Sequence, residues 1–90
     1  MMWPRPQDPR CDKIKNRLRY LLDALRQIEY RIYQLEQRKA EVIRCPDYDP
    51  YARFDLSRIE AYISELNFKK NEIEREKYVL TLQLHQLKCL

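Results

Sequence analysis

The sequence predicts an all-α protein that folds as two long antiparallel helices forming a coiled-coil hairpin. Three observations indicate this class. The 90 residues include no glycine, while 36% are charged and 44% are hydrophobic. Apolar residues follow two long heptad repeats, and a single proline-bounded segment separates these repeats. A hydrophobic period of 3.5 residues sustained over several heptads specifies the seam of a left-handed coiled coil.

Residues 1–7 are expected to form an extended N-terminal arm, because prolines at positions 4 and 6 favour extended backbone. Asp8 and Pro9 then resemble a helix start, with a capping carboxylate followed by proline at the first helical position. The chain therefore divides into this arm and a single helical-hairpin domain over residues 8–90.

The first helix is predicted over about 9–44. Its apolar positions alternate in steps of three and four, which places one set at heptad position a and a second at position d. Position a holds Cys11, Leu18, Leu25, Ile32 and Lys39, and position d holds Ile14, Leu21, Ile28, Leu35 and Val42. Pro46 disfavours helical backbone at the residue before it, so the helix should end there.

A tip over residues 45–55 is predicted to reverse the chain, and the second helix is predicted over about 50–89. Asp49 and Pro50 repeat the start signal of the first helix, while Ser57 and Glu60 offer a capping box as an alternative start. Position a holds Leu56, Ile63, Lys70, Lys77 and Leu84, and position d holds Ala52, Ile59, Leu66, Ile73, Leu80 and Leu87.

An antiparallel hairpin pairs position a of one helix with position d of the other. Every layer obeys this rule when the two residue numbers sum to 98, as for Leu35 with Ile63 and for Cys11 with Leu87 at the open end. We define the seam as the apolar residues of these layers: Ile14, Leu18, Leu21, Leu25, Ile28, Ile32, Leu35, Val42, Leu56, Ile59, Ile63, Leu66, Ile73, Leu80, Leu84 and Leu87.

Other large apolar residues lie off the seam, and the segment 78–90 is apolar on nearly every side. A helix that is hydrophobic all round is normally buried all round. The predicted protein interface therefore comprises Trp3, Leu22, Tyr30, Tyr33, Phe68, Tyr78, Val79, Leu82 and Leu90. The expected partner is the chain itself, as a dimer or tetramer of hairpins, or another helical protein. Scattered, individually exposed residues are the alternative interpretation.

Charge along the two flanks of the seam indicates the same kind of association. The flank at heptad position e carries Glu29, Glu36, Glu60 and Glu74, and the flank at position g carries Arg17, Arg31, Arg38 and Lys69, with Glu76 as the main exception. Within one hairpin like charges are expected to face each other, which contributes no attraction. Beside a second hairpin an acidic flank can meet a basic one. Two solvated faces are the alternative.

A basic segment near the open end favours a second function class, an oligomeric nucleic-acid-binding protein. Its candidate contact residues are Arg10, Lys13, Lys15, Arg17 and Arg19. Such a cluster attracts phosphates electrostatically. No recognised nucleic-acid motif accompanies it, and nearby acidic residues dilute its charge.

We expect no enzyme, no cofactor, no metal site and no small-molecule substrate. His85 has no acid placed to orient it, and no Glu-x-x-His pair is present. We also expect neither a membrane span nor a secretory signal. Three cysteines are an odd number without metal-type spacing, so we expect no disulfide framework and a Cys11 thiol buried in the core. The expected location is a reducing, intracellular compartment or a particle assembled there. The predicted function is that of a structural or adaptor protein that works by self-assembly or by docking within a larger complex. A cytosolic complex, a secretion or cytoskeletal assembly and a virion are all open as its setting.

Overall fold

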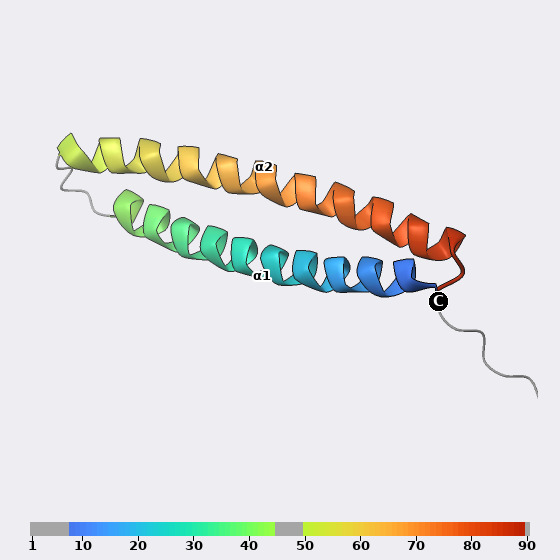
Figure 1. The fold of residues 1–90 in the computed structure, drawn as a ribbon. Helices are drawn as coiled ribbons and strands as arrows, with labels where there is room; N and C mark the ends of the chain where they lie inside the picture. The colour runs from blue at the N-terminus through green and yellow to red at the C-terminus, as the bar shows by residue number, and fades with distance from the viewer. Residues whose placement is uncertain (1–7, 45–49, 90) are drawn as a thin grey trace, which may run out of the picture.

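The computed structural model describes residues 8–44 and 50–89, and the side chains of the second range from Phe54 onward. Two helices, α1 (Pro9–Arg44) and α2 (Pro50–Gln86), run antiparallel and pack side by side along their length (Figure 1). No strand occurs in the described ranges. The prediction of an all-α helical hairpin is therefore confirmed. At 1.5 Å per residue each helix is about 54 Å long. The predicted arm with Trp3, residues 45–49 of the predicted tip, and Leu90 lie outside the described residues.

The start of α1 is capped by Asp8, as the sequence predicts. The backbone N–H of Arg10 donates to Oδ1 of Asp8 over 2.9 Å, and the N–H of Cys11 donates to the Asp8 carbonyl over 2.8 Å. Pro9 occupies the first helical position, where its missing N–H costs nothing. Helix α2 begins at Pro50, so its start follows the Asp-Pro pair and not the alternative capping box at Ser57.

Helix α2 ends at Gln86, earlier than the predicted boundary near residue 89. The N–H of Cys89 donates to the Leu84 carbonyl over 3.0 Å, and the N–H of Lys88 donates to the His85 carbonyl over 3.1 Å. Lys88 has a φ of 55°. These two bonds and the left-handed residue form a Schellman motif, which satisfies the last carbonyls of the helix and turns the chain back.

Two hydrophobic clusters join α1 and α2 along the seam. One cluster joins Leu35, Ile59 and Leu66 with the half-buried Ile28, Ile32 and Ile63. A second cluster at the open end joins Cys11, Leu84 and Cys89 with Ile14, Leu18 and Leu87. Both clusters fit the register in which paired residue numbers sum to 98. Many seam residues, including Val42, Leu56, Ile73 and Leu80, stay half-buried because each helix covers only one side of its partner.

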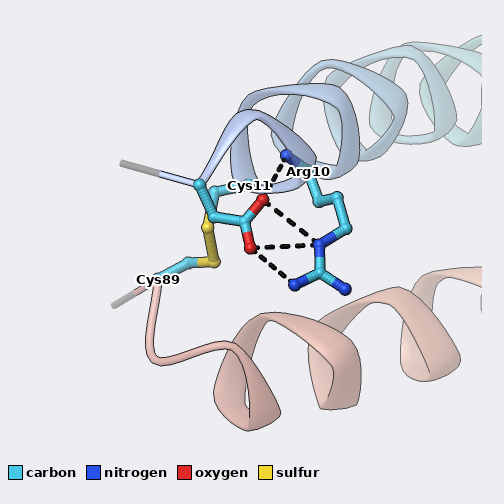
Figure 2. Close-up of a disulfide and its surroundings, with 4 residues drawn as sticks. Arg10, Cys11 and Cys89 are labelled. Atoms are coloured by element: carbon cyan, nitrogen blue, oxygen red, sulfur yellow. Dashed lines mark hydrogen bonds and ion pairs between the residues drawn. A yellow bond between two sulfur atoms is a disulfide. The ribbon is translucent and has the colours of Figure 1, made fainter. Parts of the chain in front are cut away.

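A disulfide joins Cys11 to Cys89 at the open end, with a Cα–Cα distance of 5.8 Å (Figure 2). Cys11 is buried as predicted, but its sulfur is in a disulfide and is not the expected free thiol. Had α2 continued to residue 89, Cys89 would occupy heptad position f and point away from α1. The turn at Lys88 instead brings Cys89 over Cys11, where the disulfide also contacts Leu84, the Schellman residue that commonly packs against this position.

Cys11 and Cys89 are 78 residues apart in the sequence, so the disulfide closes a loop that contains nearly the whole hairpin. The chain-entropy model gives a stabilisation of roughly 4.5 kcal/mol for a loop of that length. This is a large contribution for a chain with only eight buried hydrophobic residues in its described part. Small folds with little core commonly depend on such a cross-link.

We expect Cys89→Ser to lower the free energy of unfolding by roughly 3–4 kcal/mol, because the unfolded chain regains the entropy that the cross-link removes. Urea unfolding followed by circular dichroism measures the change. Cys45→Ser is the matched control, since Cys45 is the cysteine outside this disulfide. Reductant should reproduce the loss in the wild-type protein and should have no further effect on Cys89→Ser. Equal unfolding curves with and without reductant would contradict the prediction.

A second substitution tests the turn that positions Cys89. Left-handed backbone costs a residue with a Cβ roughly 1–2 kcal/mol, and the cost is higher for a β-branched residue. Lys88→Val should therefore lower the free energy of unfolding by about 1 kcal/mol, whereas Lys88→Gly should not lower it. Both variants are compared by urea unfolding. Equal losses in the two variants would show that the φ of residue 88 does not matter.

Candidate interaction surfaces

Two lysines at heptad position a reach across the seam to glutamates of the other helix. Lys39 Nζ lies 3.4 Å from Glu60 Oε1, and Lys70 Nζ lies 3.6 Å from Glu29 Oε1. All four side chains are partly exposed, so each pair contributes less than about 1 kcal/mol. Glu29 and Glu60, two of the four glutamates of the acidic flank, are therefore already paired within the hairpin.

The basic flank also has partners within the hairpin. Arg17 donates from Nε to Glu76 Oε1 over 2.9 Å and from a terminal nitrogen to Oε2 over 3.3 Å. The Arg31 guanidinium lies over the Tyr62 ring, 5.7 Å from its centroid. The expectation that the flanks contribute no attraction within one hairpin is therefore wrong. Glu76 departs from the basic pattern of its flank and pairs with Arg17, and the lysines at position a reach glutamates on the e flank of the opposite helix.

Hydrogen bonding shifts the acid–base equilibria at two of these surface sites. The pKa of Asp8 lies below its ordinary value, chiefly because the Arg10 side chain donates to its carboxylate and secondly because the Arg10 backbone N–H does so (Figure 2). The pKa of Arg17 lies above its ordinary value, chiefly because Glu76 accepts its hydrogen bonds. Both effects hold the charged forms in place at neutral pH.

The basic residues proposed for nucleic-acid contact do not share one surface. At 100° per residue, Arg10, Lys13 and Arg17 lie on one side of α1, while Lys15 and Arg19 lie on the opposite side. Arg10 is hydrogen-bonded to Asp8, and Arg17 to Glu76. The structure therefore divides this cluster and pairs two of its five charges with carboxylates.

The off-seam apolar residues within the described ranges are all exposed, from 41% for Leu22 to 66% for Tyr78. They are Leu22, Tyr30, Tyr33, Phe68, Tyr78, Val79 and Leu82. Four further large hydrophobic residues, Tyr20, Ile43, Phe54 and Tyr62, are exposed but do not belong to the predicted protein interface. The same heptad frame would have found them, since all four lie outside positions a and d.

A shallow groove of about 360 Å³ lies on one side of the hairpin near the tip, and we call it the arginine groove. Its floor is the seam residues Leu35 and Ile59. Three arginines, one acid and one tyrosine form its walls: Arg31, Arg38, Arg58, Asp55 and Tyr62. Sequence reasoning missed this site because Arg58 stands apart in the sequence and only the register brings it to the two arginines of α1.

Within residues 8–44 and 50–89, no group of three or more His, Cys, Asp or Glu side chains could hold a metal ion. His85 is exposed, and no polar side chain is buried in this part of the chain. Neither described helix combines the length and the apolar character needed to cross a membrane. The described surface thus consists of aromatic residues, charged flanks and one arginine-lined groove.

No protein-family model, curated protein or solved structure matches this chain. No functional residue can therefore be transferred from a relative. The function has to be argued from the surfaces described above.

The contact between Asp8 and Arg10 predicts a specific acid titration. Because the folded-state pKa of Asp8 is lowered, the stability it contributes is present above its ordinary pKa and is lost as the pH falls through the lowered value. Arg10→Gln should raise the titration midpoint of the Asp8 carboxyl towards its ordinary value. NMR detection of that carboxyl measures the shift. Arg19→Gln, which removes a similar charge from the opposite side of α1, should leave the midpoint unchanged, and equal shifts would contradict the assignment.

Proposed function

We propose that this chain is a non-catalytic structural or adaptor protein that works by associating with further copies of itself or with another helical protein. One observation supports this function above the others. Eleven large hydrophobic side chains are exposed over the outer faces of the hairpin, whereas eight hydrophobic residues are buried in its described part. Burying a Val, Leu or aromatic side chain of this size stabilises a complex by roughly 1.5–3 kcal/mol.

The charged surfaces favour a protein partner over nucleic acid. The basic segment is split between two sides of α1, and carboxylates already neutralise Arg10 and Arg17. The side of α1 that does gather basic residues borders acidic residues of α2, among them Glu65, Glu72 and Glu76, which weakens its attraction for phosphates. The aromatic residues and the mixed charges are instead the composition that protein interfaces favour.

The disulfide bears on where this association takes place. A reducing compartment was expected from the cysteine count, and the Cys11–Cys89 disulfide does not fit it, because cytosolic glutathione and thioredoxin keep most thiols reduced. The hairpin that we propose to be the working form is the cross-linked one, which persists in oxidising surroundings.

Light scattering across a concentration series tests the proposed function. We expect the oxidised protein to have a solution mass that is a multiple of its 11.2 kDa chain mass, because self-association covers the exposed apolar residues. A soluble, folded monomer at every concentration would exclude self-assembly. A protein that is helical only after a second protein is added would instead support docking onto another helical partner.

A further inference from the structure

The side of the hairpin that holds the arginine groove carries opposite charge on its two helices. We call it the groove face and define it as heptad positions c and g of both repeats. On α1 its charged residues are Arg10, Lys13, Arg17, Arg31, Arg38 and Glu41, which gives five positive and one negative charge, or +4. Asp8, which lies outside these positions, pairs with Arg10 and offsets one of the positive charges. On α2 they are Asp55, Arg58, Glu65, Lys69, Glu72 and Glu76, which gives two positive and four negative charges, or −2.

Contacts in the structure show that these positions share one face. Arg17 pairs with Glu76, and Arg31 lies over Tyr62, so the g positions of the two helices meet on the same side of the seam. Arg58, at position c, lines the groove together with Arg31. Residues seven apart lie on the same side of a helix, so Glu65 and Glu72 continue the column that begins at Arg58.

The opposite face, at positions b and e, lacks this polarity. There α1 carries Lys15, Arg19, Arg26, Asp12, Glu29 and Glu36, which sum to zero, and the described part of α2 carries only Glu60 and Glu74 as charged residues. Only on the groove face do both helices carry net charge of opposite sign within the described ranges. That face can therefore attract a copy of itself.

We propose that two hairpins associate through their groove faces about a two-fold axis parallel to the helices. This proposal rests on the self-association proposed above and specifies its geometry. Rotation about that axis places α1 of each copy over α2 of the other, with both tips at the same end. The groove-face residues of α1, with a net charge of +4, then meet those of α2, with a net charge of −2. A two-fold axis across the helices would place the +4 columns on each other, which costs energy.

The seam register then gives the residues that meet between the copies. In each hairpin residue n of α1 lies level with residue 98 − n of α2, and the two-fold axis keeps these levels. Glu65 of one copy falls level with residue 33 of the other, next to Arg31 of the arginine groove. Arg58 falls level with residue 40, next to Glu41. Val79 falls level with residue 19, next to the exposed Tyr20.

These three layers are chemically complementary. Two join opposite charges, and the third joins an apolar side chain to an aromatic ring. Symmetry produces each of them twice, which gives four pairs of opposite charge and two apolar contacts. The same register also places Lys69 level with residue 29, two residues from Arg31, and Arg58 two residues from the level of Arg38, so these like charges offset part of the attraction. The arginine groove thus receives the carboxylate of a second copy, with its apolar floor at Leu35 and Ile59 beneath the glutamate stem.

A charge-swap experiment on the full chain tests this arrangement. Arg31→Glu and Glu65→Arg are each expected to raise the dimer dissociation constant at least roughly tenfold, because each places like charges together twice. The double variant R31E/E65R should return the constant to near the wild-type value. Sedimentation equilibrium measures the constants, and circular dichroism checks that each variant is helical. Arg26→Glu and Glu36→Arg, equal charge changes on the opposite face, are the controls and should have little effect.

The outcomes separate this geometry from the broader function. If the wild-type protein associates but the double variant does not recover, or if the controls weaken association equally, the groove-face dimer is wrong while self-association stands. If the wild-type protein stays monomeric, the groove-face dimer and self-association are both wrong, and docking onto another helical protein is the part of the proposed function that stands. If a monomer binds polyglutamate or a nonspecific DNA duplex and loses that binding in Arg31→Glu, the groove serves an acidic polypeptide or a nucleic acid, and the proposed dimer is overturned.

Discussion

The hairpin depends on one stripe of apolar side chains, because two helices can offer each other only one side. Leu21, Leu25, Leu35, Ile59, Leu66 and Leu84 are buried in this stripe, while many of their neighbours remain half-exposed. The residues that border the stripe therefore face water and a partner helix at once. Lys39 and Lys70 interrupt the stripe at heptad position a. Their aliphatic stems pack at the seam, and their ammonium groups reach glutamates of the other helix.

The open end compensates for the narrow seam with several linked contacts. Asp8 caps α1, the Schellman motif ends α2, and the disulfide joins the two ends. The disulfide depends on the Schellman motif, because Cys89 reaches Cys11 only when the chain turns at Lys88. The cluster of Cys11, Leu84 and Cys89 is consequently among the best-buried parts of the described chain.

Most of the hairpin could be predicted from the sequence because the apolar residues of a coiled-coil seam recur with a simple period of about 3.5 residues. The alternation from Ile14 to Val42, and its counterpart from Leu56 to Leu87, determines both helices and their register. The disulfide could not be found in this way. A lysine at a left-handed helix end has no sequence signature like that of glycine, so the helix seemed to continue and Cys89 seemed to face outward. The arginine groove was not predicted, because Arg58 is far in sequence from Arg31 and Arg38 and forms a basic cluster with them only in the folded hairpin.

The disulfide also changes how the molecule responds to mechanical load. Cys11 and Cys89 lie at the same end of the hairpin, so everything between them forms a closed covalent ring. Tension applied through the segments before Cys11 and after Cys89 passes through the sulfur–sulfur bond and bypasses the seam. The two helices therefore cannot be unzipped from that end while the bond is intact, and a single backbone cut between them would leave both pieces attached.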